Sequence, residues 1–107
     1  MSEKSKSKIS SVQQLYEMLR YVAVPDGLYV ISKDGQRIGG NPVMGFSGFY
    51  CIENDSDGWM IYYEDQARQR NVYTRCKNES QACKFFYSLL AEYKTHYHSP
   101  YPDDYTR

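Results

Sequence analysis

Apolar residues near the start of the chain recur every three or four positions, which predicts an amphipathic helix. Either Ser10 or Ser11 can cap this helix, and a glutamine stands three residues after each of them, as in a capping box. The stretch "VPDG", residues 24–27, ends it, because a proline cannot continue a helix. The apolar stripe consists of Val12, Leu15, Tyr16, Leu19 and Val22.

From residue 28 to residue 76 the pattern changes to short β-rich runs separated by polar turns. Asp34-Gly35 stands between the first two runs and predicts a two-residue hairpin. Short turns join consecutive strands in antiparallel fashion, so the pattern predicts an antiparallel meander sheet of about five strands. The runs are "LYVIS" (28–32), "QRIGG" (36–40), "FYCIE" (49–53), "WMIYYE" (59–64) and "NVYTRC" (71–76).

A second helix is predicted after these strands. Asn78 can accept backbone N–H bonds as its cap, with Gln81 three residues later. Its apolar face consists of Ala82, Phe85, Phe86, Leu89, Leu90 and Tyr93. The element order predicts one α+β domain over residues 9–94, with the sheet flanked by an N-terminal and a C-terminal helix. Residues 1–8 are predicted to be disordered, and residues 95–107 to form an extended tail.

Alternation along the last two strands assigns their side chains to the two faces of the sheet. One face is apolar and is predicted to lie under the helices, whereas the other combines tyrosine with charge. In the first strand Trp59, Ile61 and Tyr63 share one side, and Met60, Tyr62 and Glu64 share the other. In the second strand Val72, Thr74 and Cys76 are grouped against Asn71, Tyr73 and Arg75.

Composition adds two features to this picture. The chain has thirteen basic and thirteen acidic side chains, yet residues 25–65 carry two of the basic and seven of the acidic ones. This acidic centre argues against nucleic-acid binding, for which a basic stripe is typical. It either suits a basic protein partner or forms a solvated loop face. Twelve of the 107 residues are tyrosine, a side chain that is enriched at protein interfaces.

Candidate catalytic and metal-binding groups are few. His96 and His98 fall in the predicted tail, and an extended segment does not hold a catalytic base in place, nor a metal together with Asp103 and Asp104. The three cysteines, Cys51, Cys76 and Cys83, have no C-x-x-C spacing and are predicted to be small buried side chains rather than zinc ligands or disulfides. We therefore predict a protein that is not an enzyme, with no catalytic residue, cofactor or metal site.

Location follows from the same pattern. No run of about eighteen apolar residues is present, and the lysine-containing start "MSEKSKSKISS" is not followed by an apolar segment. The sequence therefore predicts a cytoplasmic protein without a membrane span.

The stretch "GWMIYYEDQARQRNVYTRCKNESQACKFFYSLL", residues 58–90, resembles the C-terminal half of small bacterial immunity proteins of polymorphic-toxin and contact-dependent growth inhibition systems. A strand ending in glutamate matches at Glu64, and a helix opening with glutamate and alanine–cysteine matches at Glu79 and Ala82-Cys83. The glutamate–arginine–glycine turn of that pattern is replaced here by "DQARQR". The resemblance implies a non-catalytic cytoplasmic protein that binds one cognate toxin domain, often a nuclease such as an RNase, and blocks its active site.

Together these observations predict an immunity protein that binds its toxin as a monomer or in a 1:1 complex, with no nucleic-acid or membrane partner. Acidic side chains would steer a basic toxin, and tyrosines would anchor it. Two alternatives are an antitoxin or regulatory module with another partner, and a small enzyme whose cleft the sequence does not reveal. The predicted partner-binding residues are Glu53, Asp55, Asp57, Tyr62, Glu64, Asp65 and Tyr73.

Overall fold

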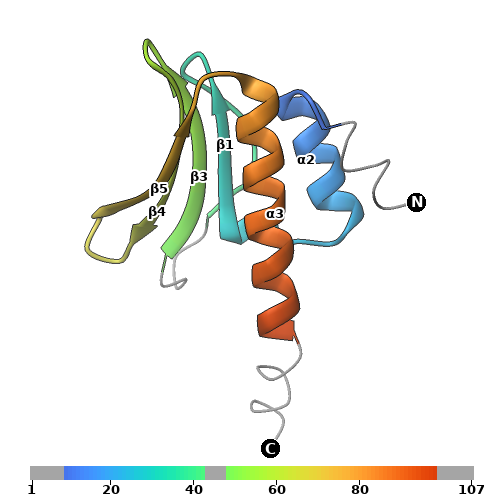
Figure 1. The fold of residues 1–107 in the computed structure, drawn as a ribbon. Coiled ribbons are helices and arrows are strands. Elements are labelled where there is room, and N and C mark those ends of the chain that lie inside the picture. The colour runs from blue at the N-terminus through green and yellow to red at the C-terminus, as the bar shows by residue number, and fades with distance from the viewer. Residues whose placement is uncertain (1–8, 43–47, 99–107) are drawn as a thin grey trace, which may run out of the picture.

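The computed structural model of the protein describes residues 9–42 and 48–98, with side chains as far as Ala91. The chain forms an α+β fold with a five-stranded sheet and two α-helices in the described part (Figure 1). In chain order the elements are α2 (Val12–Tyr21), the 3-10 helix η1 (Asp26–Leu28), β1 (Tyr29–Lys33), β2 (Gln36–Gly39), β3 (Gly48–Asp55), β4 (Gly58–Asp65), β5 (Arg70–Cys76) and α3 (Glu79–His98).

The sheet is mixed, with the strand order β2-β1-β3-β4-β5, so the prediction of a purely antiparallel meander is wrong. β1 and β2 form the predicted antiparallel hairpin, but β3 then pairs with β1 in parallel, on the side of β1 away from β2. Residues 40–47 stand between β2 and β3 in the sequence, and part of this connection, residues 43–47, lies outside the described residues. β3, β4 and β5 continue in antiparallel fashion as predicted.

Both helices lie on the same side of the sheet, which gives two layers (Figure 1). α2 packs against β1 and β2, and α3 packs against β3, β4 and β5 as well as against α2. The core between the layers contains the buried side chains of both helices and of the inner strands. Its largest fully buried members are Tyr29, Phe86, Ile9, Leu15, Leu19, Ile31, Ile52, Ile61, Leu90 and Cys83.

The helix caps form much as their sequences predict. The Ser11 hydroxyl accepts a hydrogen bond from the Gln14 backbone N–H at 3.2 Å, and the Asn78 side chain accepts one from the Gln81 backbone N–H at 2.8 Å. The Gln14 side chain accepts from the backbone N–H and the hydroxyl of Ser10, one residue before the cap. The apolar stripes face the core, except that Phe85 lies at the edge of its stripe and is 40% exposed.

α3 continues to His98, so the prediction of an extended tail beginning at residue 95 is wrong for residues 95–98, which include His96 and His98. The side chains of Tyr93, His96 and His98 fall outside the described ones, as do residues 1–8 and 99–107, on which the predictions of a disordered start and an extended tail depend.

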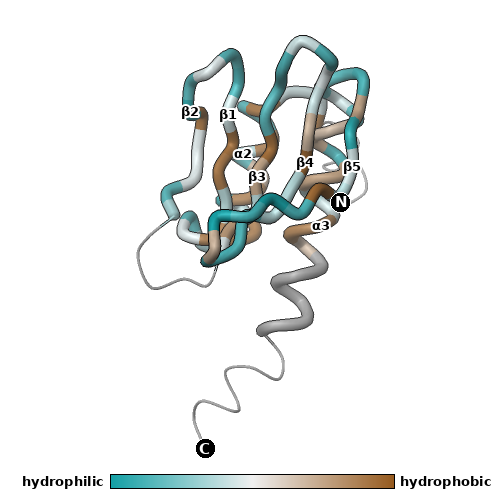
Figure 2. The backbone as a smooth tube through the Cα atoms, turned by 90° about the vertical axis from the view of Figure 1, so that its left-hand side faces the viewer, coloured by the Kyte–Doolittle hydropathy of each residue, from teal (hydrophilic) through white to brown (hydrophobic). Residues whose placement is uncertain are grey.

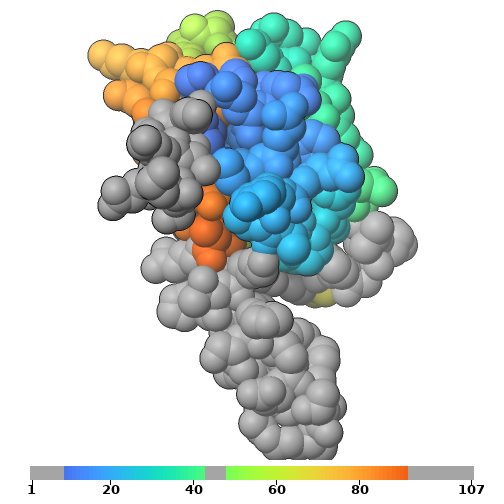
Figure 3. Space-filling view, turned by 90° about the vertical axis from the view of Figure 1, so that its right-hand side faces the viewer, coloured from blue at the N-terminus to red at the C-terminus, as the bar shows by residue number. Residues whose placement is uncertain are grey.

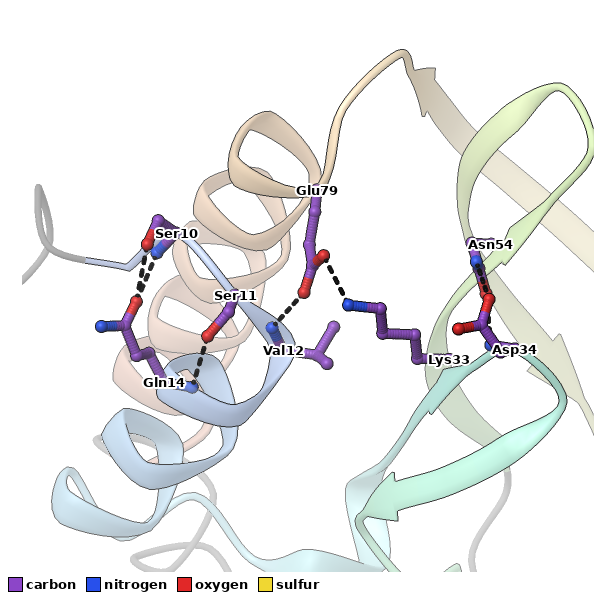
Figure 4. A network of polar contacts seen from close by, with 8 residues as sticks. All are labelled: Ser10, Ser11, Val12, Gln14, Lys33, Asp34, Asn54 and Glu79. Carbon is purple, nitrogen blue, oxygen red and sulfur yellow. Dashed lines mark hydrogen bonds and ion pairs between the residues drawn. The ribbon is translucent and has the colours of Figure 1, made fainter.

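A single carboxylate joins the two layers at one end of the molecule. Glu79, in the first turn of α3, accepts a hydrogen bond from the Val12 backbone N–H at 2.8 Å and one from the Lys33 ammonium at 3.0 Å (Figure 4). It therefore satisfies an N–H that the first turn of α2 leaves without an intrahelical partner. Glu79 and Lys33 also form an ion pair, whose hydrogen bond raises the pKa of Lys33.

Candidate interaction face

The side of the sheet turned away from α2 and α3 has no described helix or strand over it, and we call it the open face. Figure 2 looks onto it, with the five strands side by side. Register and alternation assign side chains from all five strands to this face. They are Val30 and Ser32 from β1, Arg37 from β2, Phe49, Cys51, Glu53 and Asp55 from β3, Met60, Tyr62 and Glu64 from β4, and Arg70, Val72 and Arg75 from β5.

Tyr62 lies at the centre of the open face but is 3% exposed. Its hydroxyl donates a hydrogen bond to Glu53 at 3.0 Å, and the Arg70 guanidinium lies over its ring, 4.6 Å from the ring centroid. Burial is the main reason why the pKa of Tyr62 is raised, and Glu53 contributes. The predicted anchor is thus covered by its neighbours, and a partner would meet Arg70 and Glu53 above it.

A second charged group occupies the end of the open face near the turn between β3 and β4. Arg75 forms an ion pair with Asp55 at 3.0 Å and also contacts the Met60 sulfur. Asp55 accepts a further hydrogen bond from the Asp57 backbone N–H. The Arg75 guanidinium and this N–H hold the pKa of Asp55 below its ordinary value.

The remaining predicted acidic residues differ in how far they are engaged. Asp65 accepts hydrogen bonds from the backbone N–H groups of Ala67 and Gln69, so it stabilises the turn between β4 and β5. The carboxylates of Asp57 and Glu64 make no hydrogen bond or ion pair to another side chain among the described residues. Of the five predicted acidic residues, these two are therefore the ones with unengaged carboxylates.

The strict alternation predicted for β5 is broken by one residue. Ile61 pairs with Thr74, but the next residue of β4, Tyr62, pairs with Val72. Tyr73 is therefore the extra residue of a β-bulge. A bulge shifts the alternation on one side of it, so the predicted grouping of Val72 with Thr74 and Cys76 on one face is wrong.

Tyr73 lies on the helix side of the sheet, not with Tyr62 and Arg75 as predicted. Its ring stacks on that of Tyr50 with the centroids 6.2 Å apart, and Tyr50 in turn contacts Tyr63 at 4.8 Å and packs against the core. Tyr73 remains 48% exposed, because the helices do not cover this part of β5. The structure therefore separates the two predicted anchors onto opposite faces.

Sequence reasoning missed Arg70 on the open face, and it assigned Arg75 to the charged face by alternation without including it among the predicted partner-binding residues. The pairing of β5 with β4 places both arginines beside the acidic residues of β3 and β4. It also missed Val72, whose 54% exposure is the largest for an apolar side chain in the sheet. The arginines were visible in the sequence, but their contacts depend on a strand register that the sequence does not display.

The three cysteines are free thiols. Cys51 and Cys83 are buried and Cys76 is half-buried and packs against the core, so the predicted burial is confirmed for the first two and in part for the third. Burial raises the pKa of Cys51 and of Cys83 to about 12 each, which disfavours the reactive thiolate.

Among residues 9–42 and 48–91, no group of three histidine, cysteine or acidic side chains is arranged to hold a metal ion. The helices within the described part are too short or too polar to cross a bilayer.

The side opposite the open face is centred on α2 (Figure 3, blue).

No protein-family model matches the chain, and neither a curated protein nor a solved structure gives a significant match.

Proposed function

We propose that the chain is an immunity protein that binds a cognate toxin domain in the cytoplasm and blocks its active site without itself catalysing a reaction. The toxin would belong to a polymorphic-toxin or contact-dependent growth inhibition system, and a nuclease such as an RNase fits best. The resemblance of residues 58–90 to such immunity proteins supports this proposal.

The observation that carries the proposal is the open face. It is a broad surface on rigid strands, on which charged groups lie over the buried Tyr62 ring and beside the half-buried Phe49 and the exposed Val72. Protein interfaces usually combine apolar contacts with surrounding polar groups. A sheet also holds such a surface in place before binding, which lowers the entropic cost of association.

The charge on this face suits a basic partner, with local rather than uniform attraction. On β3, β4 and β5 the open face carries Glu53, Asp55 and Glu64 against Arg70 and Arg75, and these formal charges sum to −1, whereas Arg37 lies on β2 at the far edge of the sheet. Nuclease domains bind phosphates with basic side chains, and the acidic surplus complements such a surface. We therefore place the toxin contact on the open face around β3, β4 and β5.

The test measures binding of the purified chain to an inactivated form of the toxin domain encoded beside its gene. Val72→Lys places a charge on the edge strand β5 of the open face, directly opposite Tyr62, and is expected to lower the affinity by roughly tenfold or more. Tyr21→Lys is the matched control, because Tyr21 is 83% exposed on α2, on the other side of the sheet. It is expected to leave the affinity unchanged.

The thermal unfolding midpoints of both variants verify that the fold is kept. If the wild-type chain binds the toxin domain but Tyr21→Lys weakens binding and Val72→Lys does not, the contact lies on the helix side. If the wild-type chain does not bind or protect, the immunity function is wrong, and binding to genomic DNA then tests the regulatory alternative.

A further inference from the structure

Two charged groups lie on the open face and in the turn beside it between β3 and β4, and each has one more carboxylate than guanidinium. In the first, Glu53 and Glu64 flank Arg70: Arg70 lies 3.8 Å from Glu53 and pairs in register with Glu64. In the second, Asp55 and Asp57 accompany Arg75. Each group has a formal charge of −1, so one additional cation would balance it.

The carboxylates within each group are engaged to different degrees. Asp55 binds Arg75 through both of its oxygens, at 3.0 and 3.4 Å, and Glu53 binds the Tyr62 hydroxyl and lies near Arg70. The Glu64 and Asp57 carboxylates have no hydrogen-bonded side-chain partner in the described part. A new cation gains most where a carboxylate has none, so these two are the candidate contacts for a partner.

The surroundings of Glu64 and Asp57 distinguish them. Glu64 stands within β4, directly opposite the half-buried Phe49 on β3. The next pair of residues on the same face of β4 and β5 consists of Tyr62 and the exposed Val72. Asp57 is exposed in the turn between β3 and β4. Docking over Glu64 would exclude water with apolar side chains, which strengthens an ion pair, whereas a turn stays solvated.

We infer that Glu64 is the central charged contact of the proposed toxin interface and receives a cationic side chain, arginine or lysine, from the toxin domain. The aliphatic stem of that side chain would lie on Phe49 and Val72, and its charge would complete the group of Glu53, Glu64 and Arg70. This inference rests on the proposed function and assigns Asp57 a peripheral, solvated role.

Two isosteric substitutions separate these roles: Glu64→Gln and Asp57→Asn. Each removes one negative charge from an unengaged carboxylate, so the two variants have the same net charge and differ only in where that charge is lost. Association and dissociation rates with the inactivated toxin domain are measured at low and high salt. A desolvated contact is expressed mainly in the dissociation rate, whereas a peripheral charge acts mainly on the association rate and is screened by salt.

We expect Glu64→Gln to weaken binding by about tenfold or more, mostly through faster dissociation that persists at high salt. Asp57→Asn is expected to weaken binding by less than about threefold, through slower association. High salt should remove this difference in association rate between the variant and the wild-type chain. Equal effects of the two substitutions, or a larger effect of Asp57→Asn, overturn the role of Glu64. If the wild-type chain binds and Glu64→Gln binds equally well, this inference fails while the proposed function stands; if the wild-type chain does not bind, both fail.

Discussion

Glu79 lies in the first turn of α3, but its side chain accepts a hydrogen bond from the first turn of α2. Its side chain, 21% exposed, accepts from the Val12 backbone N–H and from Lys33, which joins α2, β1 and α3 at one point (Figure 4). A hydrogen bond from a partly buried backbone N–H to a carboxylate is among the stronger ones in proteins. Removing the acceptor would also leave that N–H without a partner.

Glu79→Ala is therefore expected to lower the free energy of unfolding by about 2 kcal/mol, measured by urea denaturation. Glu79→Gln keeps an acceptor and should cost less. Lys33→Ala is the control, because it removes the partly exposed ion pair but leaves the bond to the Val12 N–H, and ion pairs that water reaches contribute little. If Lys33→Ala and Glu79→Ala destabilise the protein equally, the ion pair and not the N–H bond carries the effect.

Single residues also show which contacts the sequence could predict. The caps at Ser11 and Asn78 join residues three apart, so local spacing was sufficient to find them. The bond from Tyr62 to Glu53 and the ion pair of Asp55 with Arg75 join residues nine and twenty positions apart. These contacts depend on strand register, and register was not visible in the pattern of apolar and polar positions.

At the scale of the elements, the turns set the register of the sheet. Asp34-Gly35 and the glycine at position 58 both lie in tight connections, and Gly35 and Gly58 have φ values of +80° and +123°. Their surroundings differ. A Cβ at Gly58 would lie 2.6 Å from the Cys76 carbonyl oxygen on the neighbouring strand, whereas a Cβ at Gly35 meets nothing within 4 Å.

Gly58→Ala is thus expected to be clearly more destabilising than Gly35→Ala. Gly35→Ala adds the strain of a positive φ, about 1 kcal/mol, whereas Gly58→Ala adds a steric clash with backbone and should cost at least about 1 kcal/mol more. Thermal and urea unfolding of the two variants provide the comparison. Equal losses would indicate that the end of β5 moves aside without cost.

The same scale explains the two errors in the predicted sheet. Turn residues identify hairpins, but the connection of residues 40–47 carries no signal that would distinguish an antiparallel return from a parallel crossover. The bulge at Tyr73 has no signature either, since "NVYTRC" alternates like a regular strand. The prediction that tyrosine and charged side chains share one face is therefore correct for Tyr62 and Glu64 on β4 and wrong for Tyr73 on β5.

At the scale of the whole molecule, the sequence was sufficient to predict that helices cover one face of the sheet and leave the other face open. Two amphipathic helices and five short strands can bury one face of a sheet, and the α+β class follows from that count. The distribution of charge over the surface could not be predicted from the sequence. Basic and acidic segments that are separate in the sequence come together on the open face, where Arg70 and Arg75 meet Glu53 and Asp55.

Two buried thiols provide a test of whether this arrangement behaves as one cooperative unit. Cys51 of β3 points to the open face and is 3% exposed. Cys83 of α3 is fully buried on the other side of the sheet. β3 pairs with β1 and β4, and Ile52 beside Cys51 packs in the core shared with both helices. Opening β3 should consequently expose both layers together.

Thiol labelling in increasing urea, read by mass spectrometry of the labelled peptides in a Cys76→Ala background, measures this opening. Cys51 and Cys83 are expected to label at rates that rise with the same slope, equal to that of global unfolding, because each is protected by contacts that bridge the sheet. Substantially faster labelling of Cys51, with a small urea slope, would show that the open face frays independently of the helices. Addition of the toxin domain should then slow Cys51 and Cys83 equally in the cooperative case, because ligand binding stabilises the whole native state by mass action.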